Sequence, residues 1–240
     1  MKSRIASMLR KEYKYRPSKE LCDYIKEALV GHMSVDMYGK TTIISIYYDT
    51  PEHLLIRRSI EKPRFKEKVR IRAYGLVGDD DKVFVEVKRK VRGVVYKRRV
   101  KSTEREAEKF FRYESDLAEG GQIAHEISYT RDYYKNLKPK LMILYDRTAY
   151  IQDSSGLRIT IDENPRYRTD SLNLHTSIEG ISILSPGEAI LEIKAQSSLP
   201  LWLTNILVSG KIYRTSFSKV GEAFKKYHAT LASEERKSVL

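Results

Sequence analysis

The sequence predicts an α+β protein built on an antiparallel β-sheet. Strand patterns dominate, and the helices between them show no regular strand–helix–strand alternation. Within the strands, a two-residue alternation puts apolar side chains on one face and Lys, Arg and Glu on the other. If every apolar face packs against helices, the charged faces share the opposite side. Closure of such a sheet would give a β-barrel with a charged interior, decorated by helices.

The elements follow from local patterns taken in chain order. A turn at Gly93 joins two charged strands into a hairpin, Thr103 and Glu106 form a capping box at the start of a helix, and Pro51 fits the first turn of another. No linker-like stretch is present, which favours one domain over residues 1–240. Strands are expected at RKEYKYR near the start and over 42–50, 64–75, 83–90, 94–101, 141–151, 157–162 and 189–195, and helices over 18–30, 51–60, from Thr103, over 122–137, from Pro200 and over 219–232.

Composition indicates a polyanionic partner. The 240 residues include 45 Lys and Arg against 32 Asp and Glu, a net charge of +13. Nucleic acid, an acidic membrane surface and phosphates all fit this charge. The single cysteine, Cys22, excludes an intramolecular disulfide and favours a reducing compartment. The first residues lack the apolar core of a signal peptide, and no stretch approaches the ~20 apolar residues of a membrane span, so a cytoplasmic protein is expected.

The stretch RFKEKVRIRAYG, residues 64–75, is the most unusual of the strands. Neighbouring cations on one strand face lie about 7 Å apart and repel by about 2.4 kcal/mol at an effective dielectric of 20. On an open surface, splayed side chains and salt remove most of this cost, whereas inside a cleft the row needs anions. Alternation places Lys66, Lys68, Arg70 and Arg72 on one face and Val69, Ile71 and Ala73 on the other.

The triplet Glu-x-Lys occurs three times in strand-like contexts, and each pair shares a strand face. A charged interior is affordable only if it is wet, cross-paired or holds a bound anion. Arginine forks and lysine ammonium groups suit phosphate oxygens, and scattered carboxylates suit Mg²⁺ or Mn²⁺. The pairs are Glu12 with Lys14, Glu86 with Lys88, and Glu192 with Lys194, and a fourth charged face carries Arg158, Thr160 and Asp162.

The chain resembles a known family over about residues 8–228. The segments RKEYKY, SIYYDT, KVRIRAYG, VFVEVKRK, VYKRR, YDRTAY, RITID, LEIK and SFSK occur in the order found in the VTC domain. That domain is the polyphosphate polymerase domain of the triphosphate tunnel metalloenzymes. The resemblance implies an antiparallel β tunnel lined by basic residues. It also implies transfer of the ATP γ-phosphate onto a polyphosphate chain with Mn²⁺ or Mg²⁺.

The resemblance also implies roles for individual residues. Catalytic contacts to phosphate are expected from Arg70, Arg72, Lys88, Arg147 and Lys219. Substrate binding is expected from Lys14, Lys97, Lys194, Arg158 and Ser218, and metal binding from Glu192. The last motif departs from the family, because Val220 replaces a common aromatic residue and Ser216 stands where eukaryotic members carry a cation.

Several alternatives stay open at this stage. Glu192 could form a structural salt bridge, with Glu12 or Glu86 as the metal ligand instead. Arg147 could pair with Asp146 or another carboxylate, and a one-residue slip of register would exchange the faces of the strand that carries Lys97. The five histidines show no metal-binding spacing.

Two other functions would use nearly the same residues. One is a metal-dependent triphosphatase or polyphosphatase, and the other is a module that binds polyphosphate or nucleic acid without turnover. No specific nucleic acid is expected as a partner. The chain offers no membrane segment, so any membrane role would require a partner protein.

Overall fold

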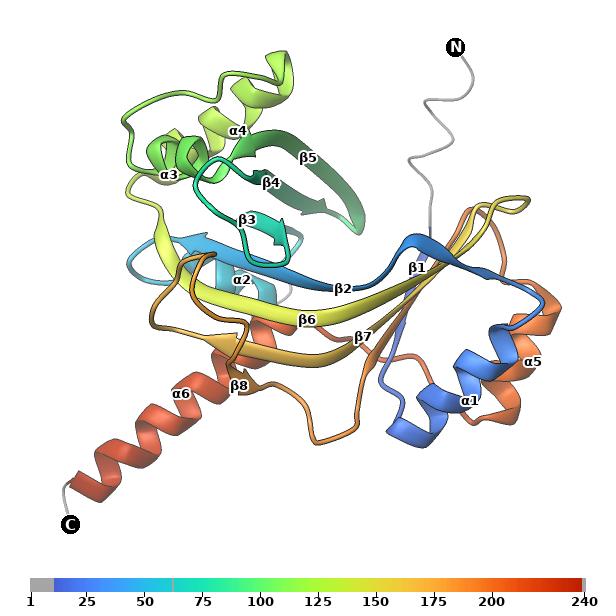
Figure 1. Ribbon diagram of the computed structural model, residues 1–240. Helices are drawn as coiled ribbons and strands as arrows, with labels where there is room; N and C mark the ends of the chain where they lie inside the picture. Colours follow the sequence, from blue (N-terminus) through green and yellow to red (C-terminus); the bar gives the residue numbers. More distant parts are fainter. Residues whose placement is uncertain (1–10, 62, 239–240) are drawn as a thin grey trace. The chain divides into compact units, whose positions relative to one another are not determined.

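The computed structural model describes residues 11–61 and 63–238, and its sheet confirms the α+β antiparallel class. The strands pair in the order β1-β9-β7-β6-β2-β3-β4-β5, with β8 beside β7 (Figure 1). The strands are β1 (Lys11–Tyr15), β2 (Ser34–Asp49), β3 (Phe65–Tyr74), β4 (Lys82–Val91), β5 (Val94–Thr103), β6 (Lys138–Gln152), β7 (Leu157–Arg168), β8 (Ile181–Ser182) and β9 (Ile190–Ala195). The helices are α1 (Lys19–Leu29), α2 (Leu54–Glu61), α3 (Glu104–Phe111), α4 (Gly121–Tyr134), α5 (Leu201–Ser209) and α6 (Lys219–Ser238).

The chain divides into two compact units, each with its own core. The first unit comprises the chain up to Thr41 together with Tyr145–Pro165 and Leu184–Phe217. The second comprises Thr42–Leu144, Arg166–Ile183 and the chain from Ser218. The expectation of one domain over residues 1–240 stays a prediction.

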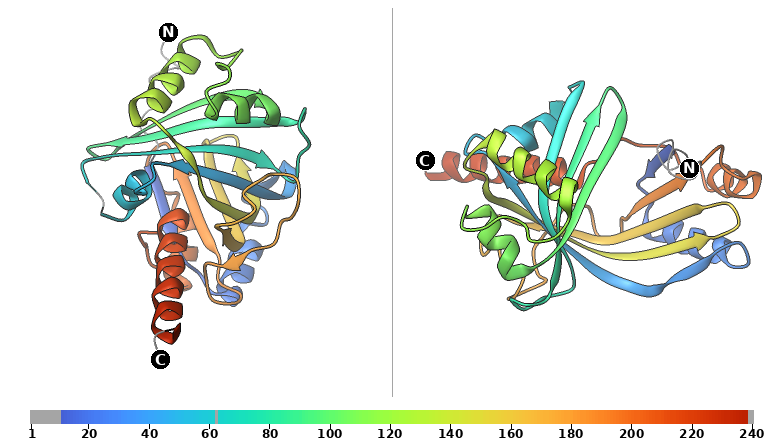
Figure 2. Two further views of the ribbon diagram at one scale, coloured as in Figure 1. Left: turned by 90° about the vertical axis from the view of Figure 1, so that its left-hand side faces the viewer. Right: turned by 90° about the horizontal axis from the view of Figure 1, so that it is seen from above.

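In the first unit, β1 and β7 flank β9, and α1 and α5 cover their apolar face (Figure 2). Helix α1 begins after Ser18, whose hydroxyl accepts a hydrogen bond from the Leu21 amide. Its apolar stripe of Cys22, Ile25 and Leu29 is buried with residues of α5 and the strands. The polar residues of the strands therefore belong to the opposite face.

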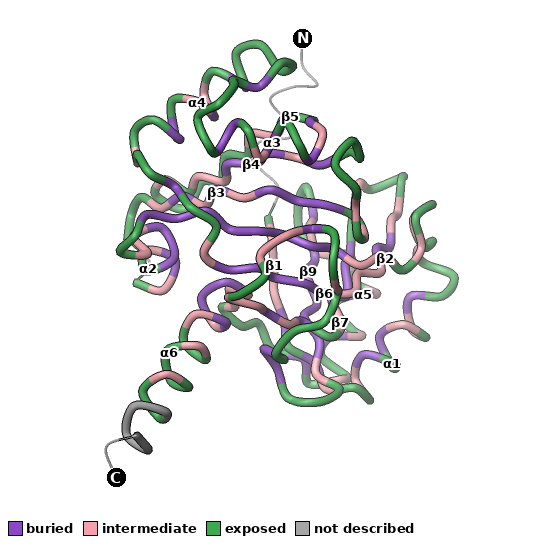
Figure 3. Tube along the Cα trace, turned by 60° about the vertical axis from the view of Figure 1, so that its left-hand side comes forward, coloured by how far each residue is buried: buried purple, intermediate pink, exposed green. Residues whose placement is uncertain are grey.

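In the second unit, β3, β4 and β5 form two successive hairpins, and α3 and α4 pack on their apolar face. Val69 and Ile71 of β3 are buried as the alternation predicts, and Figure 3 shows buried residues concentrated along the strands. The turn between β4 and β5 uses positive φ at Arg92 and at Gly93, as a two-residue hairpin requires. Thr103 and Glu106 complete the predicted capping box of α3.

Several boundaries differ from the sequence-based expectation. Helix α2 begins at Leu54, because the buried Asp49 carboxylate accepts hydrogen bonds from the amides of Leu55 and Ile56 and holds Pro51 in a turn. Strand β2 begins earlier than expected, at Ser34. Strand β7 extends to Arg168, beyond its expected end at residue 162. None of the described helices combines the length and hydropathy that crossing a bilayer requires.

Candidate functional site

Glu86 is the centre of a charged cluster in the second unit. Its side chain is 1% exposed, on the face of β4 opposite the apolar core. Lys97 Nζ lies 2.7 Å and Arg99 Nε 3.2 Å from Glu86 Oε1, and Arg70 Nη2 lies 2.7 Å from Oε2. Arg72 Nε is 4.0 Å from the same oxygen. The register explains this gathering, since Arg70 and Arg99 are the two cross-strand partners of Glu86.

The Glu86 cluster contains more positive than negative charge. Burial alone would raise the pKa of Glu86, but the charges of Arg70, Arg72 and Lys97 lower it to about 2. Burial lowers the pKa of Lys97 to about 8 in spite of the neighbouring carboxylate. One carboxylate thus faces four cations. Such a surplus favours anions, because arginine forks and ammonium groups bind phosphate oxygens well.

Two polar residues of β2 hold the arginines of this cluster. Arg70 Nη1 donates to the Tyr47 hydroxyl at 2.9 Å, and Arg72 Nε donates to the Ser45 hydroxyl at 3.2 Å. Burial opposes ionisation of Tyr47, yet the charges of Arg70 and Arg72 lower its pKa. Ser45 and Tyr47 were not among the site residues predicted from the sequence. The alternation of TIISIYYDT could have placed both on the face of the cations.

The start of α6 contributes further cations in the second unit. Lys68 Nζ donates to Ser218 Oγ at 3.0 Å, and the same oxygen accepts the Gly221 amide at 3.3 Å. Ser218 therefore caps the helix, and Lys219 is its first residue. Lys88 stands directly across from Lys68 in the sheet register. The positive end of the helix dipole at this point adds to the attraction for phosphate.

In the first unit, Lys14 lies between two carboxylates. Its Nζ is 3.2 Å from Glu192 Oε1 and 3.4 Å from Glu12 Oε1. Burial opposes the charge of Lys14, but Glu192 and Glu12 together raise its pKa. Lys194 and Glu12 are cross-strand partners in the same register that pairs Lys14 with Glu192. Burial lowers the pKa of Lys194.

Arg147 is bound mainly by Asp162. Its Nε and Nη2 donate to the two carboxylate oxygens of Asp162 at 2.6 and 2.7 Å. Glu192 Oε2 is farther from Arg147, at 3.8 Å. The sequence left open whether Arg147 pairs with Asp146 or with another carboxylate. The structure shows the second, with Asp162 as the partner. Because Asp162 is fully buried, this fork fixes the guanidinium beside Glu192.

The structure thus divides the predicted site residues between the two units. Arg158 is the most exposed member of the first group, and its Nη2 lies 3.4 Å from Asp36. The first unit contains Lys14, Arg147, Arg158, Glu192 and Lys194, and the second contains Arg70, Arg72, Lys88, Lys97, Ser218 and Lys219.

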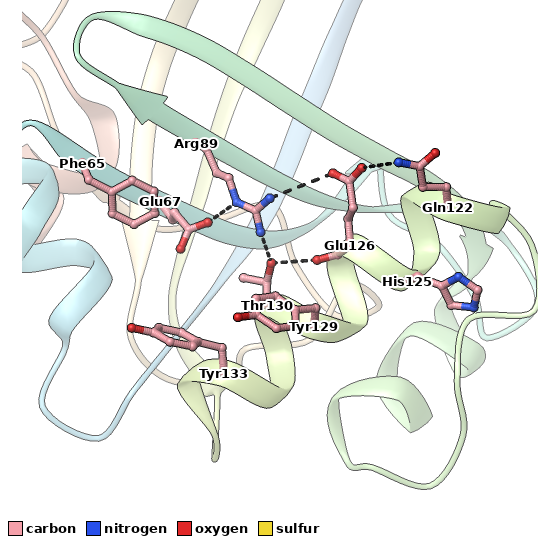
Figure 4. Close-up of a pocket in the computed structure, with 9 residues that line it drawn as sticks. All are labelled: Phe65, Glu67, Arg89, Gln122, His125, Glu126, Tyr129, Thr130 and Tyr133. Atoms are coloured by element: carbon pink, nitrogen blue, oxygen red, sulfur yellow. Dashed lines mark hydrogen bonds and ion pairs between the residues drawn. The ribbon is translucent and has the colours of Figure 1, made fainter.

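A separate pocket of about 580 Å³ lies between α4 and the face of β3 and β4 that α4 covers (Figure 4). Arg89 pairs there with Glu67 and donates to Thr130 at 2.5 Å, while the Tyr129 and Tyr133 rings are exposed. Glu67 and Arg89 belong to the face that α4 covers, opposite the Glu86 cluster. This pocket therefore lies outside the candidate site.

A family model named VTC domain matches residues 9–228. The chain belongs to the VTC domain family. This assignment places it among the CYTH-like triphosphate tunnel proteins, as the ordered motifs imply. A search of curated proteins found no match.

A solved structure shares the fold of this VTC domain. A candidate adenylate cyclase from Bacillus halodurans is 15% identical, with a TM-score of 0.53, and the match covers 88% of this chain and 96% of that one. The PH1819 protein of Pyrococcus horikoshii is 16% identical over 90% of this chain and 99% of that one, with a TM-score of 0.48. At these identities the likeness concerns the fold alone.

Proposed function

We propose that this VTC domain is a polyphosphate polymerase that transfers the ATP γ-phosphate to a growing polyphosphate chain. The single observation that carries the proposal is the cationic surplus around Glu86, where four cations face one carboxylate. Family membership supports the same substrate class, a triphosphate or polyphosphate. We propose that the protein acts in the cytoplasm. Export of the polyphosphate product would require a membrane protein as a partner.

The cations of the second unit are the proposed phosphate ligands. Arg70 and Arg72 are held by Glu86, Tyr47 and Ser45, so their guanidinium groups are oriented before an anion arrives. Burial lowers the pKa of Lys97, so an incoming anion can raise it again and increase the positive charge of the site. Lys88, Lys219 and Ser218 extend the proposed track along β4 and the start of α6.

The family implies a divalent cation, and residues of the first unit fit one. Glu192 and Glu12 direct oxygens toward one point, where Lys14 Nζ now lies. The Thr160 hydroxyl, across the register from Glu192, is buried and has no hydrogen-bond partner among the residues that the structure describes. Carboxylate and hydroxyl oxygens are the donors that Mg²⁺ and Mn²⁺ prefer. Bound there, the ion would neutralise charge on phosphate oxygens.

The proposed reaction needs no covalent intermediate with the protein. A terminal oxygen of the polyphosphate chain attacks the γ-phosphorus of ATP and forms a new P–O bond. The bond from that phosphorus to the β–γ bridging oxygen breaks, and ADP leaves with the electron pair. Positioning and charge stabilisation supply most of the rate in such transfers. Lys14, Lys194, Arg147 and Arg158 would hold the chain or the leaving group through their charges.

The test is incubation of the purified chain with ATP and Mn²⁺ in parallel with tripolyphosphate and Mn²⁺. Polymer on a stained gel from ATP is expected. Glu192→Gln should lower turnover by at least 100-fold while tripolyphosphate binding stays measurable, and the exposed Glu61→Gln should change neither. Phosphate release without polymer would replace the polymerase with a triphosphatase, and binding without either product would leave a binding module.

A further inference from the structure

Three potential metal ligands meet in the second unit, outside the Glu86 cluster. They are Asp79 in the turn before β4, Glu104 at the start of α3, and His175 in the loop after β7. One ligand atom from each lies within 4.8 Å of the other two. The histidine spacing in the sequence gave no sign of this site, because the three segments are far apart in the chain.

Backbone hydrogen bonds tie these segments together. The Val77 amide donates to the Leu174 carbonyl at 3.1 Å, next to His175. The Arg105 amide donates to the Asp79 carbonyl at 2.9 Å. These main-chain bonds hold the segments that carry the three side chains next to one another, as a preorganised site requires.

The orientation of His175 indicates a ligand at its second nitrogen. Nδ1 lies 2.7 Å from the Val77 carbonyl oxygen, which can only accept, so Nδ1 carries the hydrogen. The other nitrogen, Nε2, faces Glu104 Oε1 at 3.7 Å and Asp79 Oδ1 at 3.9 Å. Both distances are too long for hydrogen bonds. A backbone carbonyl behind the imidazole is the usual support of a metal-binding histidine.

Glu104 is a buried carboxylate that lacks a fixed cation. Its side chain is 3% exposed, and within the described part of the chain no Lys or Arg forms an ion pair with it. Of the nearby cations, Arg112 pairs with Glu108, and Arg105 pairs with Asp80 and with Asp79 of the ligand set. A cation among the three ligands would compensate this group.

We propose that Asp79, Glu104 and His175 bind a divalent transition-metal ion, with Zn²⁺ bound more tightly than Mn²⁺. Imidazole nitrogen and carboxylate oxygen are both zinc ligands, and a set of three protein ligands leaves a fourth position for water. The order of affinities of divalent ions supports zinc over manganese. The ion would fasten α3 to the turn before β4 and to the loop after β7. This site does not depend on the proposed polymerase activity.

The test is a calorimetric titration of Zn²⁺ into chelator-treated full-length protein, with bound metal counted by mass spectrometry after dialysis. We expect one tightly bound zinc and a rise in Tm with zinc. His175→Ala and Glu104→Gln should each weaken zinc binding at least tenfold. Asp80→Asn is the matched control, because Asp80 is 85% exposed and outside the ligand set. Glu192→Gln should also leave zinc binding unchanged.

Cobalt substitution gives an independent readout. Co²⁺ in the wild-type chain should show visible absorption bands that His175→Ala removes. Equal zinc affinity in His175→Ala and the wild-type protein would overturn the proposal, as would the absence of any bound zinc. If Glu104→Gln does not fold, Asp79→Asn takes its place, and circular dichroism of each variant checks the fold.

Discussion

The Glu86 cluster and the Glu192 cluster use the same Glu-x-Lys triplet with different charge balance. Around Glu86, four cations share one carboxylate. Around Glu192 the balance is even, because the carboxylates of Glu12, Asp162 and Glu192 accompany three cations, which are Lys14, Arg147 and Lys194. The surplus in the second unit favours a polyanion, whereas the carboxylates of the first unit favour a divalent cation. Identical triplets thus acquire different roles from their cross-strand partners.

The largest expected effect is the loss of stability when the Glu86 carboxylate is removed. Glu86→Gln leaves Arg70, Arg72, Lys97 and Arg99 without their shared carboxylate. We expect a loss of roughly 3–5 kcal/mol in the free energy of unfolding, as for other buried pairs that lose one partner. Urea denaturation measures this loss. Glu61→Gln, which breaks an exposed pair with Arg57, should cost less than about 1 kcal/mol.

The same variant has a defined dependence on pH. The pKa of Glu86 is lowered from 4.5 to about 2 in the folded protein. A lowered carboxyl pKa stabilises the fold fully above the unfolded value, and this contribution is lost as the pH falls through the folded value. The difference in stability between wild type and Glu86→Gln should therefore be constant above pH 4.5 and shrink toward pH 2. A constant difference down to pH 2 would show that ionised Glu86 is not what holds the cluster together.

A smaller effect concerns Lys97, whose pKa burial lowers to about 8. A bound polyanion should raise this pKa again, so tripolyphosphate binding at pH 8 should take up a fraction of a proton, at most about one half. Because the Lys97 side chain is 41% exposed, water screens part of the effect and the uptake should be small. Calorimetry in two buffers of different ionisation enthalpy measures the uptake.

The matched variants for this experiment lie on the same strand. Lys97→Met should abolish the difference in proton uptake between pH 8 and pH 6.5, since Lys97 is charged at the lower pH with or without ligand. The exposed Lys101→Met should behave as the wild type. Uptake that persists in Lys97→Met would come from the ligand or another group and would remove Lys97 from the phosphate track.

The two-residue alternation of apolar and charged side chains predicted most of the strands and the choice of charged site residues. The face of β3 with Arg70 and Arg72, the hairpin at Gly93 and the capping box of Thr103 are local patterns, and each appears as predicted. The register accounts for the meeting of Arg70 and Arg99 at Glu86 and for the pairing of Lys14 with Glu192. The roles of these residues in binding or catalysis stay predictions.

Contacts between distant segments could not be read from the sequence. Asp162 pairs with Arg147 because β6 and β7 are neighbours in the sheet, and the sequence does not fix which residues of the two strands meet. The longer course of β7 follows from pairing with β8 near its end, where the sequence signal for a strand is weak. The grouping of His175 with Asp79 and Glu104 likewise depends on where loops meet.

The division of roles between the two clusters is tested most directly by a Mn²⁺ titration followed by electron paramagnetic resonance. The chain would carry His175→Ala so that the proposed zinc site does not contribute, and Arg72→Met and Glu192→Gln would be compared on that background. We expect manganese affinity near that of the background for Arg72→Met and at least a tenfold loss for Glu192→Gln. Unchanged manganese affinity in Glu192→Gln would contradict this division of roles.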